Sequence, residues 1–405
     1  MMFILMHCIY CYFILLQEAP MDATKRHRLI WKILYTVARP YLVTRFAFTH
    51  DKASRQEPCL IISNHVTNWD PLLLSMSFRK QQISFVASEH LFRMGWLSKL
   101  IRWLVAVIPR RKGSTGMDTA MACLRQLRAG QSVCIFGSGE TSWDGLSTPV
   151  LPATAMLAQI SGATLLTYRI EGGYLTNPRW GKGLRRGKMH GHVVGVYTPE
   201  QLKAMKKEEI LNAINSDIAE DTWQNQRENP VAYKGKNRAN YLEGALFICP
   251  ACKQLGALHS EGEHLHCACG HTVRLTETGF LEPAQPFETL AQWESWQLEA
   301  YRTGDFQPAG GSIADDNVTF IKVDDDHTTH TLAEGRLALA DGVLQIGEHR
   351  LALSDIGNMA IVRTNRLIFS CLDAYYELKC HTPGCCMRKY VLAWQNTKAE
   401  KQQEV

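Results

Sequence analysis

The residues of this chain whose types and spacing best suit chemistry are His65 and Asp70, in the stretch SNHVTNWDP. A histidine and a carboxylate separated by a turn can form a dyad, because the carboxylate accepts one ring N–H and fixes the tautomer. The other ring nitrogen can then take a proton from a hydroxyl group. The structural alternative is that Asp70 caps a helix that begins at Pro71, and that His65 is an ordinary loop residue.

The elements on either side predict where this pair lies. The apolar β-run CLIIS (59–63) leads into Asn64 and His65, and a helix is predicted from Pro71 to Arg79. His65 would therefore lie in a strand-to-helix loop at the carboxyl end of a strand, where α/β sheets bind ligands.

Two later segments have residues that can bind an anion. In VIPRRKGSTG, Arg110 and Arg111 end an apolar run, and guanidinium groups in such a loop can hold a phosphate. In CIFGSGETSWDG, a strand runs into a glycine-rich turn, where backbone amides near Gly137 and Gly139 can bind negative charge. The structural alternatives are solvated basic residues and an ordinary turn.

The segments around these motifs alternate between strand and helix patterns. Strands are predicted at 83–88, 132–137 and 163–170, and helices at 117–130, 152–162 and 199–223. This alternation favours an α/β domain over about residues 45–225.

Two basic amphipathic stretches rich in aromatic residues, 23–48 and 89–109, favour contact with an anionic membrane surface. Core-packing helices with a solvated basic face are the alternative. Residues 1–20 are expected to be a weak anchor or an upstream start, because their apolar run is shorter than the roughly 20 residues of a spanning helix. The net charge of +5 is too mild to suggest bulk nucleic-acid binding.

Four cysteines have the spacing of a metal site. Cys249 and Cys252 form one close pair, and Cys267 and Cys269 form a second pair after a predicted β-hairpin. Two such pairs are what a tetrahedral four-thiolate zinc site requires, so the spacing predicts a zinc ribbon over about residues 245–285. Unrelated free cysteines are the alternative.

The remaining cysteines form no regular disulfide framework, which favours a reducing, cytosolic compartment. Cys380, Cys385 and Cys386 have no fourth partner at good spacing, although Cys371 could join them. A helix is predicted at 287–302. Residues 305–395 alternate polar and apolar residues between turn signals, which predicts a small antiparallel β-domain, similar at the level of fold to pleckstrin-homology-like modules.

In their order and separations, these motifs resemble the glycerolipid acyltransferase superfamily of the 1-acylglycerol-3-phosphate acyltransferase type. The first block of that family, Asn-His, four residues, Asp, is matched by Asn64, His65 and Asp70. Arg110 best fits the phosphate-binding arginine of the second block. The segment RIEGGYLTNPRW is similar to a bacterial subgroup that also has a short cysteine motif downstream. The resemblance covers about residues 25–280.

The third block departs from the family pattern, which is Phe-Pro-Glu-Gly-Thr-Arg-Ser. The matching residues are Phe136, Gly139 and Ser142. Ser138 stands where the family has its glutamate, and Thr141 stands where it has its arginine. Glu140, displaced by two positions, is the candidate substitute for the glutamate.

The resemblance implies an α/β fold with an acyltransferase-type mixed sheet flanked by helices, over residues 21–230. The zinc ribbon at 245–285 and the small antiparallel β-domain at 305–395 would follow it. The ribbon would hold a structural Zn²⁺. The resemblance also implies a role in phospholipid biosynthesis at the cytoplasmic face of a membrane, with peripheral or weakly anchored attachment. No nucleic-acid partner is expected, because the basic residues lie with Trp and Leu on amphipathic stretches and no recognition helix accompanies the ribbon.

The reaction implied by the resemblance moves a fatty acyl group from acyl-CoA or acyl carrier protein to a hydroxyl of a lysophospholipid such as 1-acylglycerol-3-phosphate. His65 would be the general base, oriented by Asp70. The residues expected to bind the substrates are Asn64, Arg110, Arg111, Gly137, Gly139 and Glu140. Two other classes remain open: a catalytically impaired lipid-binding scaffold, and a zinc-ribbon protein that binds nucleic acid or protein.

Overall fold

The computed structural model of this 405-residue chain describes residues 32–403, except 33–34, 37–38, 54–57, 80, 89–106, 111–115, 325–327 and 373. Several predictions fall outside the described residues. They concern residues 1–20, most of the two basic amphipathic stretches at 23–48 and 89–109, and Arg111. In the part that is described, no helix is both long enough and apolar enough to cross a membrane.

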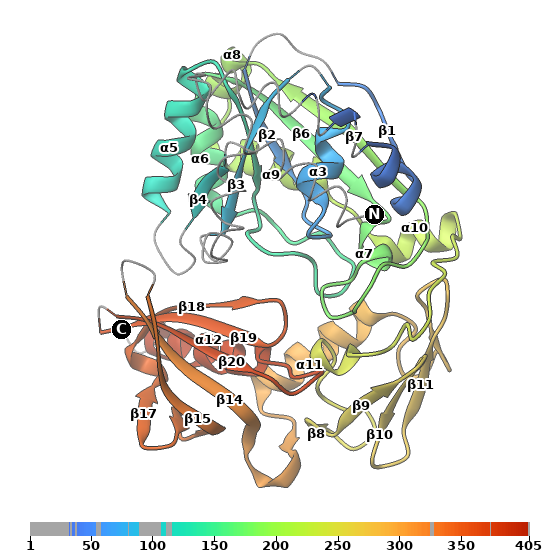
Figure 1. The fold of residues 1–405 in the computed structure, drawn as a ribbon, viewed down its shortest axis with the longest axis vertical. Coiled ribbons are helices and arrows are strands. Elements are labelled where there is room, and N and C mark those ends of the chain that lie inside the picture. Colours follow the sequence, from blue (N-terminus) through green and yellow to red (C-terminus); the bar gives the residue numbers. More distant parts are fainter. Residues whose placement is uncertain are drawn as a thin grey trace, which may run out of the picture.

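A seven-stranded mixed sheet lies at the centre of the first unit, in the order β1-β7-β6-β2-β5-β3-β4 (Figure 1). Its strands are β1 (Phe48–His50), β2 (Cys59–Ser63), β3 (Ile83–Ser88), β4 (Val107–Arg110), β5 (Ser132–Phe136), β6 (Thr164–Glu171) and β7 (Met189–Tyr197). β6, β2, β5, β3 and β4 run parallel, whereas β7 is antiparallel to β6. The segments that follow these five parallel strands therefore meet at one edge of the sheet.

Helices cover both faces of this sheet. One face is covered by α3 (Asp70–Ser75) and helical residues 39–46, and the other by α5 (Met117–Arg128), α6 (Pro152–Ile160), α8 (Pro199–Ala204) and α9 (Lys207–Ile218). Two further helices, α7 (Gly173–Thr176) and α10 (Thr222–Glu228), belong instead to the hydrophobic cluster that contains Trp143. In β2, Cys59 and Ile61 face a core formed with α3, while Leu60 and Ile62 face a core formed with α5, α6 and α9. A central strand buried on both faces reads as a continuous apolar run, which is what CLIIS is.

The structure confirms the predicted mixed α/β sheet and most of its elements, and it corrects two helices. The helix predicted at 199–223 is three helices, because Lys206 and Asp221 start new ones: the Lys206 N–H donates to Glu209, and the Asp221 side chain accepts from two backbone N–H groups. The helix predicted from Pro71 to Arg79 ends at Ser75, and its N-cap is Trp69, so Asp70 is the first helical residue.

The second unit contains the predicted cysteine-rich hairpin. A four-stranded antiparallel sheet has the order β12-β11-β10-β9, and a short strand β8 pairs with β13. Their bounds are β8 (Gln254–Leu255), β9 (Leu258–Glu261), β10 (His264–Cys267), β11 (Thr272–Leu275), β12 (Leu281–Glu282) and β13 (Gln307–Pro308). The helix predicted at 287–302 is present as α11 (Leu290–Thr303).

The third unit is a second seven-stranded sheet, fully antiparallel, as the alternating pattern predicted. Its order is β17-β16-β15-β14-β20-β19-β18. The strands are β14 (Ile313–Val323), β15 (Thr329–Ala340), β16 (Val343–Ile346), β17 (His349–Ala352), β18 (Ile356–Val362), β19 (Arg366–Cys371) and β20 (Ala374–Cys380). The final helix, α12 (Arg388–Gln403), was not predicted, and its first turns occupy residues that were assigned to the β-domain.

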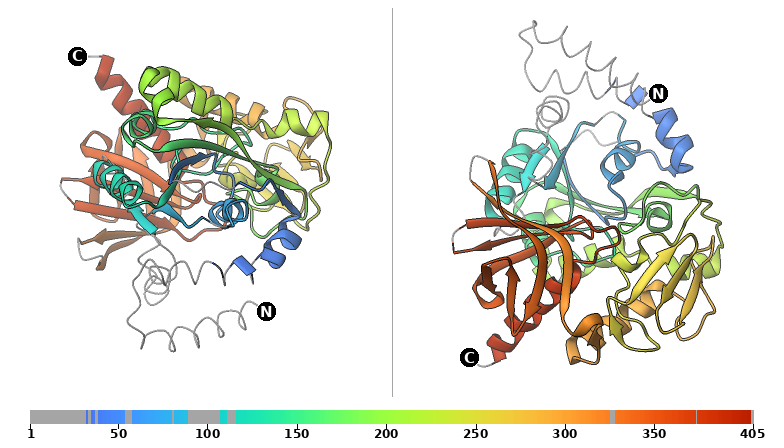
Figure 2. Two further views of the ribbon diagram at one scale, coloured as in Figure 1. Left: turned by 90° about the horizontal axis from the view of Figure 1, so that it is seen from above. Right: turned by 60° about the horizontal axis from the view of Figure 1, so that its bottom comes forward.

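The three units pack against one another (Figures 1 and 2). One hydrophobic cluster contains Trp143 and Trp223 of the first unit, Trp293 of α11 and Tyr390 of α12. Trp143 lies in the loop that follows β5. This loop therefore contacts the C-terminal units as well as the sheet from which it emerges.

Candidate active site

The predicted dyad is formed. His65 Nδ1 lies 2.7 Å from Asp70 Oδ2, and the carboxylate of Asp70 is fully buried. The same oxygen accepts the backbone N–H of Val66 at 2.7 Å, so it acts as an acceptor and His65 carries its proton on Nδ1. Nε2 then keeps its lone pair. The His65 side chain is 19% exposed, so a substrate hydroxyl can reach the ring.

The Asp70 carboxylate is held by a residue that the sequence analysis did not select. Thr67 donates its backbone N–H to both carboxylate oxygens, at 3.1 and 3.0 Å, and its hydroxyl to Oδ1 at 2.7 Å. These bonds fix the carboxylate at the first residue of α3, so its free rotation is lost. The sequence signal was a hydroxyl residue three positions ahead of the acid, a spacing common in turns that precede helices.

The last residue of β5 and the loop that follows it both contact His65. The ring of Phe136 stacks on that of His65, with centroids 4.5 Å apart. The backbone N–H of Ser142 donates to the His65 carbonyl at 3.1 Å. Phe136 and Ser142, which match the third sequence block, therefore position the histidine, and the first and third blocks meet at the carboxyl edge of the sheet.

Asn64 lies beneath the dyad and is buried. Its Nδ2–H donates to the Ile170 carbonyl at 2.8 Å, and its Oδ1 accepts the Ile170 N–H at 2.9 Å. Both ends of the amide thus pair with the backbone of β6. This geometry favours a role in fixing the end of β2 against β6 over the predicted contact with substrate.

Arg110 lies at the end of β4, beside the glycine turn. The position of a Cβ atom on Gly139 would be 3.2 Å from Arg110 Nη1, and Gly139 has a φ of +74°, so a side chain there would be both strained and crowded. The Arg110 guanidinium is partly buried, and this burial lowers its pKa from the usual value. The Arg110 side chain therefore lies at the predicted carboxyl edge of the sheet, next to the residues that match the third sequence block.

Of the two glycines of the turn, Gly139 has an amide that is used within the turn itself. The Gly139 N–H donates to the Phe136 carbonyl at 3.0 Å, so this amide closes the turn and is not free to bind an anion. Gly137 lets the strand end pack closely, because a Cβ there would lie 2.5 Å from Val150 Cγ1.

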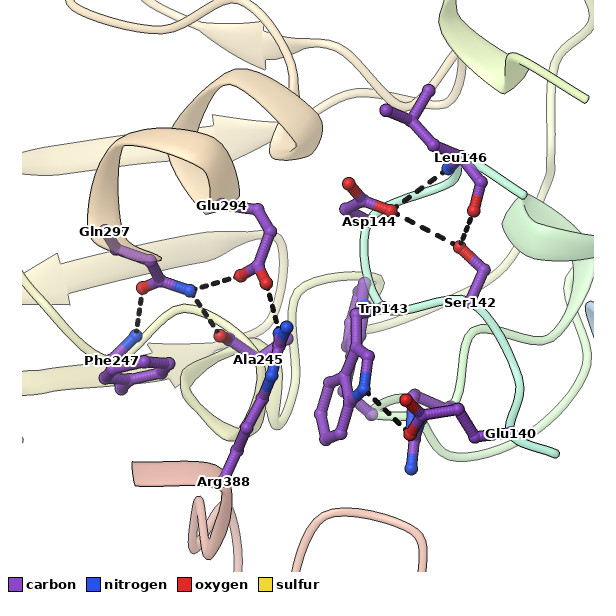
Figure 3. Close-up of polar contacts among 12 residues, drawn as sticks. Glu140, Ser142, Trp143, Asp144, Leu146, Ala245, Phe247, Glu294, Gln297 and Arg388 are labelled. Atoms are coloured by element: carbon purple, nitrogen blue, oxygen red, sulfur yellow. Dashed lines mark hydrogen bonds and ion pairs between the residues drawn. The ribbon is translucent and has the colours of Figure 1, made fainter. Parts of the chain in front are cut away.

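Glu140, the candidate substitute for the family glutamate, is partnered by Arg179 and by Trp143, and Figure 3 shows the contact with Trp143. Arg179 Nη1 donates to Glu140 Oε2 at 3.0 Å and to the Thr141 carbonyl at 2.8 Å, and its guanidinium lies 3.6 Å from the centre of a Trp143 ring. Trp143 Nε1 also donates to Glu140 Oε2 at 3.2 Å. Burial lowers the pKa of Arg179 to about 10, and Glu140 opposes that shift.

Arg179 was not predicted as a site residue. It comes from the RIEGGYLTNPRW segment and supplies a guanidinium beside Thr141, the position at which the family has an arginine. Because its side chain is only 5% exposed, Arg179 is a positioning residue rather than a substrate contact. A spacing of 38 residues gives no sequence signal for this pairing.

The loop after β5 also contacts the C-terminal units, through Trp143 (Figure 3). The Arg388 guanidinium of α12 lies 4.5 Å from the centre of a Trp143 ring and pairs with Glu294 of α11. Gln297 of α11 contacts Glu294 and donates to the Ala245 carbonyl at 2.8 Å. The packing around Trp143 thus connects the candidate site to α11 and α12.

Glu220 is a buried acid close to the same edge. Its Oε1 accepts the Gly172 N–H at 2.7 Å, just after the end of β6. Burial raises the pKa of Glu220 to about 8, and the nearby Asp70 and Glu171 add to the shift.

We expect Glu220 to make stability fall with rising pH. Its folded pKa of about 8 exceeds the ordinary value near 4.3, so the folded state keeps a proton that the unfolded chain releases. Its contribution is complete below about pH 4 and is lost as pH rises toward 8, at up to ~1.4 kcal/mol per pH unit. Urea unfolding of wild type and Glu220→Gln between pH 5 and 9 should show a flatter profile for the variant. Parallel profiles would contradict the assignment.

The four predicted zinc ligands are brought together at one end of the hairpin. The Sγ atoms of Cys249 and Cys269 are 3.8 Å apart, and those of Cys252 and Cys267 are 3.6 Å apart. A disulfide would need about 2.05 Å. Tetrahedral Zn–S bonds of about 2.3 Å give sulfur–sulfur edges of about 3.8 Å. All four sulfur atoms lie within 4.8 Å of one another, so the donor set fits a tetrahedral metal ion.

Comparison with known proteins bears on the first unit. Residues 45–171 match the family model described as "Acyltransferase". Among solved structures, the chain is similar to the crystal structure of the 1-acyl-sn-glycerophosphate (LPA) acyltransferase PlsC from Thermotoga maritima. The identity is 19%, the match covers 53% of this chain and 90% of that chain, and the TM-score is 0.43. The matched segment 45–171 includes His65, Asp70, Arg110 and the loop after β5, and it supports an acyltransferase domain in this part of the chain.

Proposed function

We propose that this chain is an O-acyltransferase that moves a fatty acyl group from a thioester donor to a hydroxyl of a lysophospholipid such as 1-acylglycerol-3-phosphate. The observation that carries the proposal is the His65–Asp70 dyad, at 2.7 Å, inside the segment that matches the acyltransferase family model. Arg110 at the same edge supports a phosphate-bearing acceptor. The donor would be acyl-CoA or acyl carrier protein.

In the proposed reaction, His65 Nε2 takes the proton of the acceptor hydroxyl while Asp70 holds Nδ1–H. The acceptor oxygen attacks the thioester carbonyl carbon, and the carbonyl–sulfur bond then breaks. The departing thiolate recovers the proton from Nε2, so the histidine returns to its starting state. The reaction forms one ester and one free thiol, and it consumes one thioester and one alcohol.

Replacing Arg110 with glutamine is the experiment that tests the acceptor assignment. A hydrogen bond to a charged group contributes about 1.5–3 kcal/mol, so we expect KM for 1-acylglycerol-3-phosphate to rise by about 10- to 100-fold, with a smaller change in kcat. Monoacylglycerol, which has no phosphate, should be used equally poorly by both proteins. Arg128→Gln is the matched control, because Arg128 is an exposed arginine on α5. An unchanged KM for the phosphate-bearing acceptor would remove Arg110 from the site.

A membrane surface is the proposed location of both lipid substrates, with the chain bound peripherally at the cytoplasmic face. Exposed apolar side chains near the candidate edge support this: Met117, in the first turn of α5, is 70% exposed, Met121 is 49% exposed, and Leu72 near the start of α3 is 37% exposed. These residues follow the strand ends that carry the site. Apolar side chains at the site edge can enter the headgroup region of a bilayer.

We also propose that the four-cysteine cluster holds a structural Zn²⁺, because its sulfur–sulfur distances fit a zinc tetrahedron. The ion would stabilise a unit too small for a large core of its own. Cys249→Ser should lose one zinc per chain and lower the melting temperature in a thermal scan. A variant that keeps its full zinc content would show that the cluster is not the ligand set.

A lipid-binding scaffold without turnover is the second candidate. The third block favours this candidate. Ser138 donates to the Glu140 carbonyl, and the Glu140 side chain is paired with Arg179, so these polar groups bind to one another. Tight lysophospholipid binding without product formation from either acyl donor would support this second reading.

A further inference from the structure

We propose a second metal site, formed by Asp315, Cys380 and Cys385, that binds a divalent zinc-class cation. The three residues lie where β14, the end of β20 and the start of α12 meet. One ligand atom of each lies within 4.8 Å of the other two. Two thiolates with one carboxylate select zinc over the harder magnesium and calcium ions, which prefer oxygen ligands.

The local backbone brings these three residues together. Asp315 lies at an irregularity in β14, where the pairing with β15 shifts between Asp315 and Val318. Such bulges redirect side chains. Cys380 ends β20, and the turn that follows, with Gly384 at a φ of +73°, returns the chain so that Cys385 faces Cys380. Asp315 is 65 positions before Cys380, so sequence spacing alone could not supply it as a ligand.

The carboxylate of Asp315 is oriented as a metal ligand is. Its Oδ2 accepts from Lys389 Nζ at 2.8 Å and from the Tyr390 hydroxyl at 2.7 Å. Its Oδ1 faces Cys385 Sγ at 3.4 Å. Outer-shell hydrogen bonds of this kind fix ligating carboxylates in known metal sites. One oxygen is therefore anchored, and the other is directed at the thiols.

The charges of the site suit a divalent ion. Two thiolates and one carboxylate carry three negative charges, Lys389 carries one positive charge, and a divalent cation brings the sum to zero. Cys380, Cys385 and Lys389 are all buried, so neutrality matters because water cannot screen them. With three protein ligands, the fourth tetrahedral position would be filled by water.

The site would fasten α12 to the sheet. Lys389 and Tyr390 belong to the first turn of α12, and the preceding residue, Arg388, contacts Trp143 of the loop after β5. The metal would thus hold the helix whose first residue packs against the candidate active-site loop.

Elemental analysis of the full chain, purified in reductant without chelators, tests this inference. We expect two zinc ions per chain, and one in the double variant Cys380→Ser/Cys385→Ser. Cys386→Ser is the matched control, because Cys386 is adjacent and buried but outside the cluster, and it should keep two. One zinc in the wild type that is lost on Cys249→Ser, or a disulfide between Cys380 and Cys385 found by mass spectrometry, would overturn the inference.

A second variant keeps the test valid if the double variant does not fold. Tyr390→Phe removes one hydrogen bond to Asp315 and preserves the buried ring. Competition with a chelating dye should show about 10- to 100-fold weaker binding of one of the two zinc ions. Unchanged affinity for both ions would count against the site. Neither readout depends on acyl transfer, so this inference and the proposed function can fail separately.

Discussion

Replacing His65 with alanine is expected to lower kcat for acyl transfer by about 10²- to 10⁴-fold, the usual contribution of a general base. The reason is geometric: Asp70 occupies Nδ1 at 2.7 Å, which leaves Nε2 as the one ring atom able to take the acceptor's proton. Initial rates with saturating thioester and 1-acylglycerol-3-phosphate measure the effect. KM for both substrates should change little, because His65 acts mainly in the transition state.

The control for this experiment is His259→Ala. His259 lies on β9 of the cysteine-rich unit and is exposed, so its loss should leave both kcat and the melting temperature near wild type. If His65→Ala retains a rate within about tenfold of wild type while remaining folded, then His65 is not the base.

Asp70→Asn is expected to have the second largest effect, a fall in kcat of about 10- to 1,000-fold. Asp70 accepts from Val66 N–H and His65 Nδ1 on one oxygen and from the Thr67 hydroxyl on the other. An asparagine has one acceptor oxygen and one donor group, so at least one of these donors would face an N–H. The histidine would then lose its fixed tautomer, and the buried loop would lose about 1–3 kcal/mol of stability.

Thr67→Val separates the role in orientation from a purely structural one. It removes the hydroxyl that donates to Oδ1 and accepts the Trp69 N–H, and it leaves the bond from His65 to Oδ2 in place. We expect the melting temperature to fall while kcat changes less than about tenfold. If Asp70→Asn lowers the melting temperature as Thr67→Val does but leaves kcat intact, Asp70 stabilises the loop and does not orient the base.

Much of the first unit could be predicted because its signals are local. The strands at 59–63 and 83–88 were predicted to the residue, since a strand buried on both faces is a short apolar run bounded by polar residues. The ends of helices were predicted less accurately than these strands. Lys206 and Asp221 both start new helices inside one continuous charged pattern, and periodicity does not reveal such breaks.

The contacts of the candidate sites could be predicted where the residues are close in sequence and could not be predicted where they are distant. His65 and Asp70 share one loop, and Arg110 follows a recognisable strand. Arg179 and Asp315, in contrast, reach their partners only through the tertiary fold, with separations of 38 and 65 residues. The contacts of Asn64 could not be predicted for a related reason, because its partner Ile170 lies on a neighbouring strand 106 residues away.

The α12 helix shows a further limit of prediction from sequence. Its first turns carry Tyr390 and Trp394, whose aromatic character suits a strand as well as a helix. In the structure, Tyr390 is fully buried and Trp394 donates to the Ile356 carbonyl at 3.0 Å. Tertiary packing against the sheet thus decides the conformation of a segment that propensity leaves open.

The most direct test of the central claim follows both products of one reaction. Wild-type protein is incubated with 1-acylglycerol-3-phosphate in vesicles and with acyl-CoA or acyl carrier protein, and free thiol and lipid are quantified by mass spectrometry. The dyad and Arg110 predict that each thiol released is matched by one diacylglycerol phosphate, and that His65→Ala reduces both products together. Thiol release without a new lipid ester, or no turnover with either donor, would contradict the assignment as an acyltransferase.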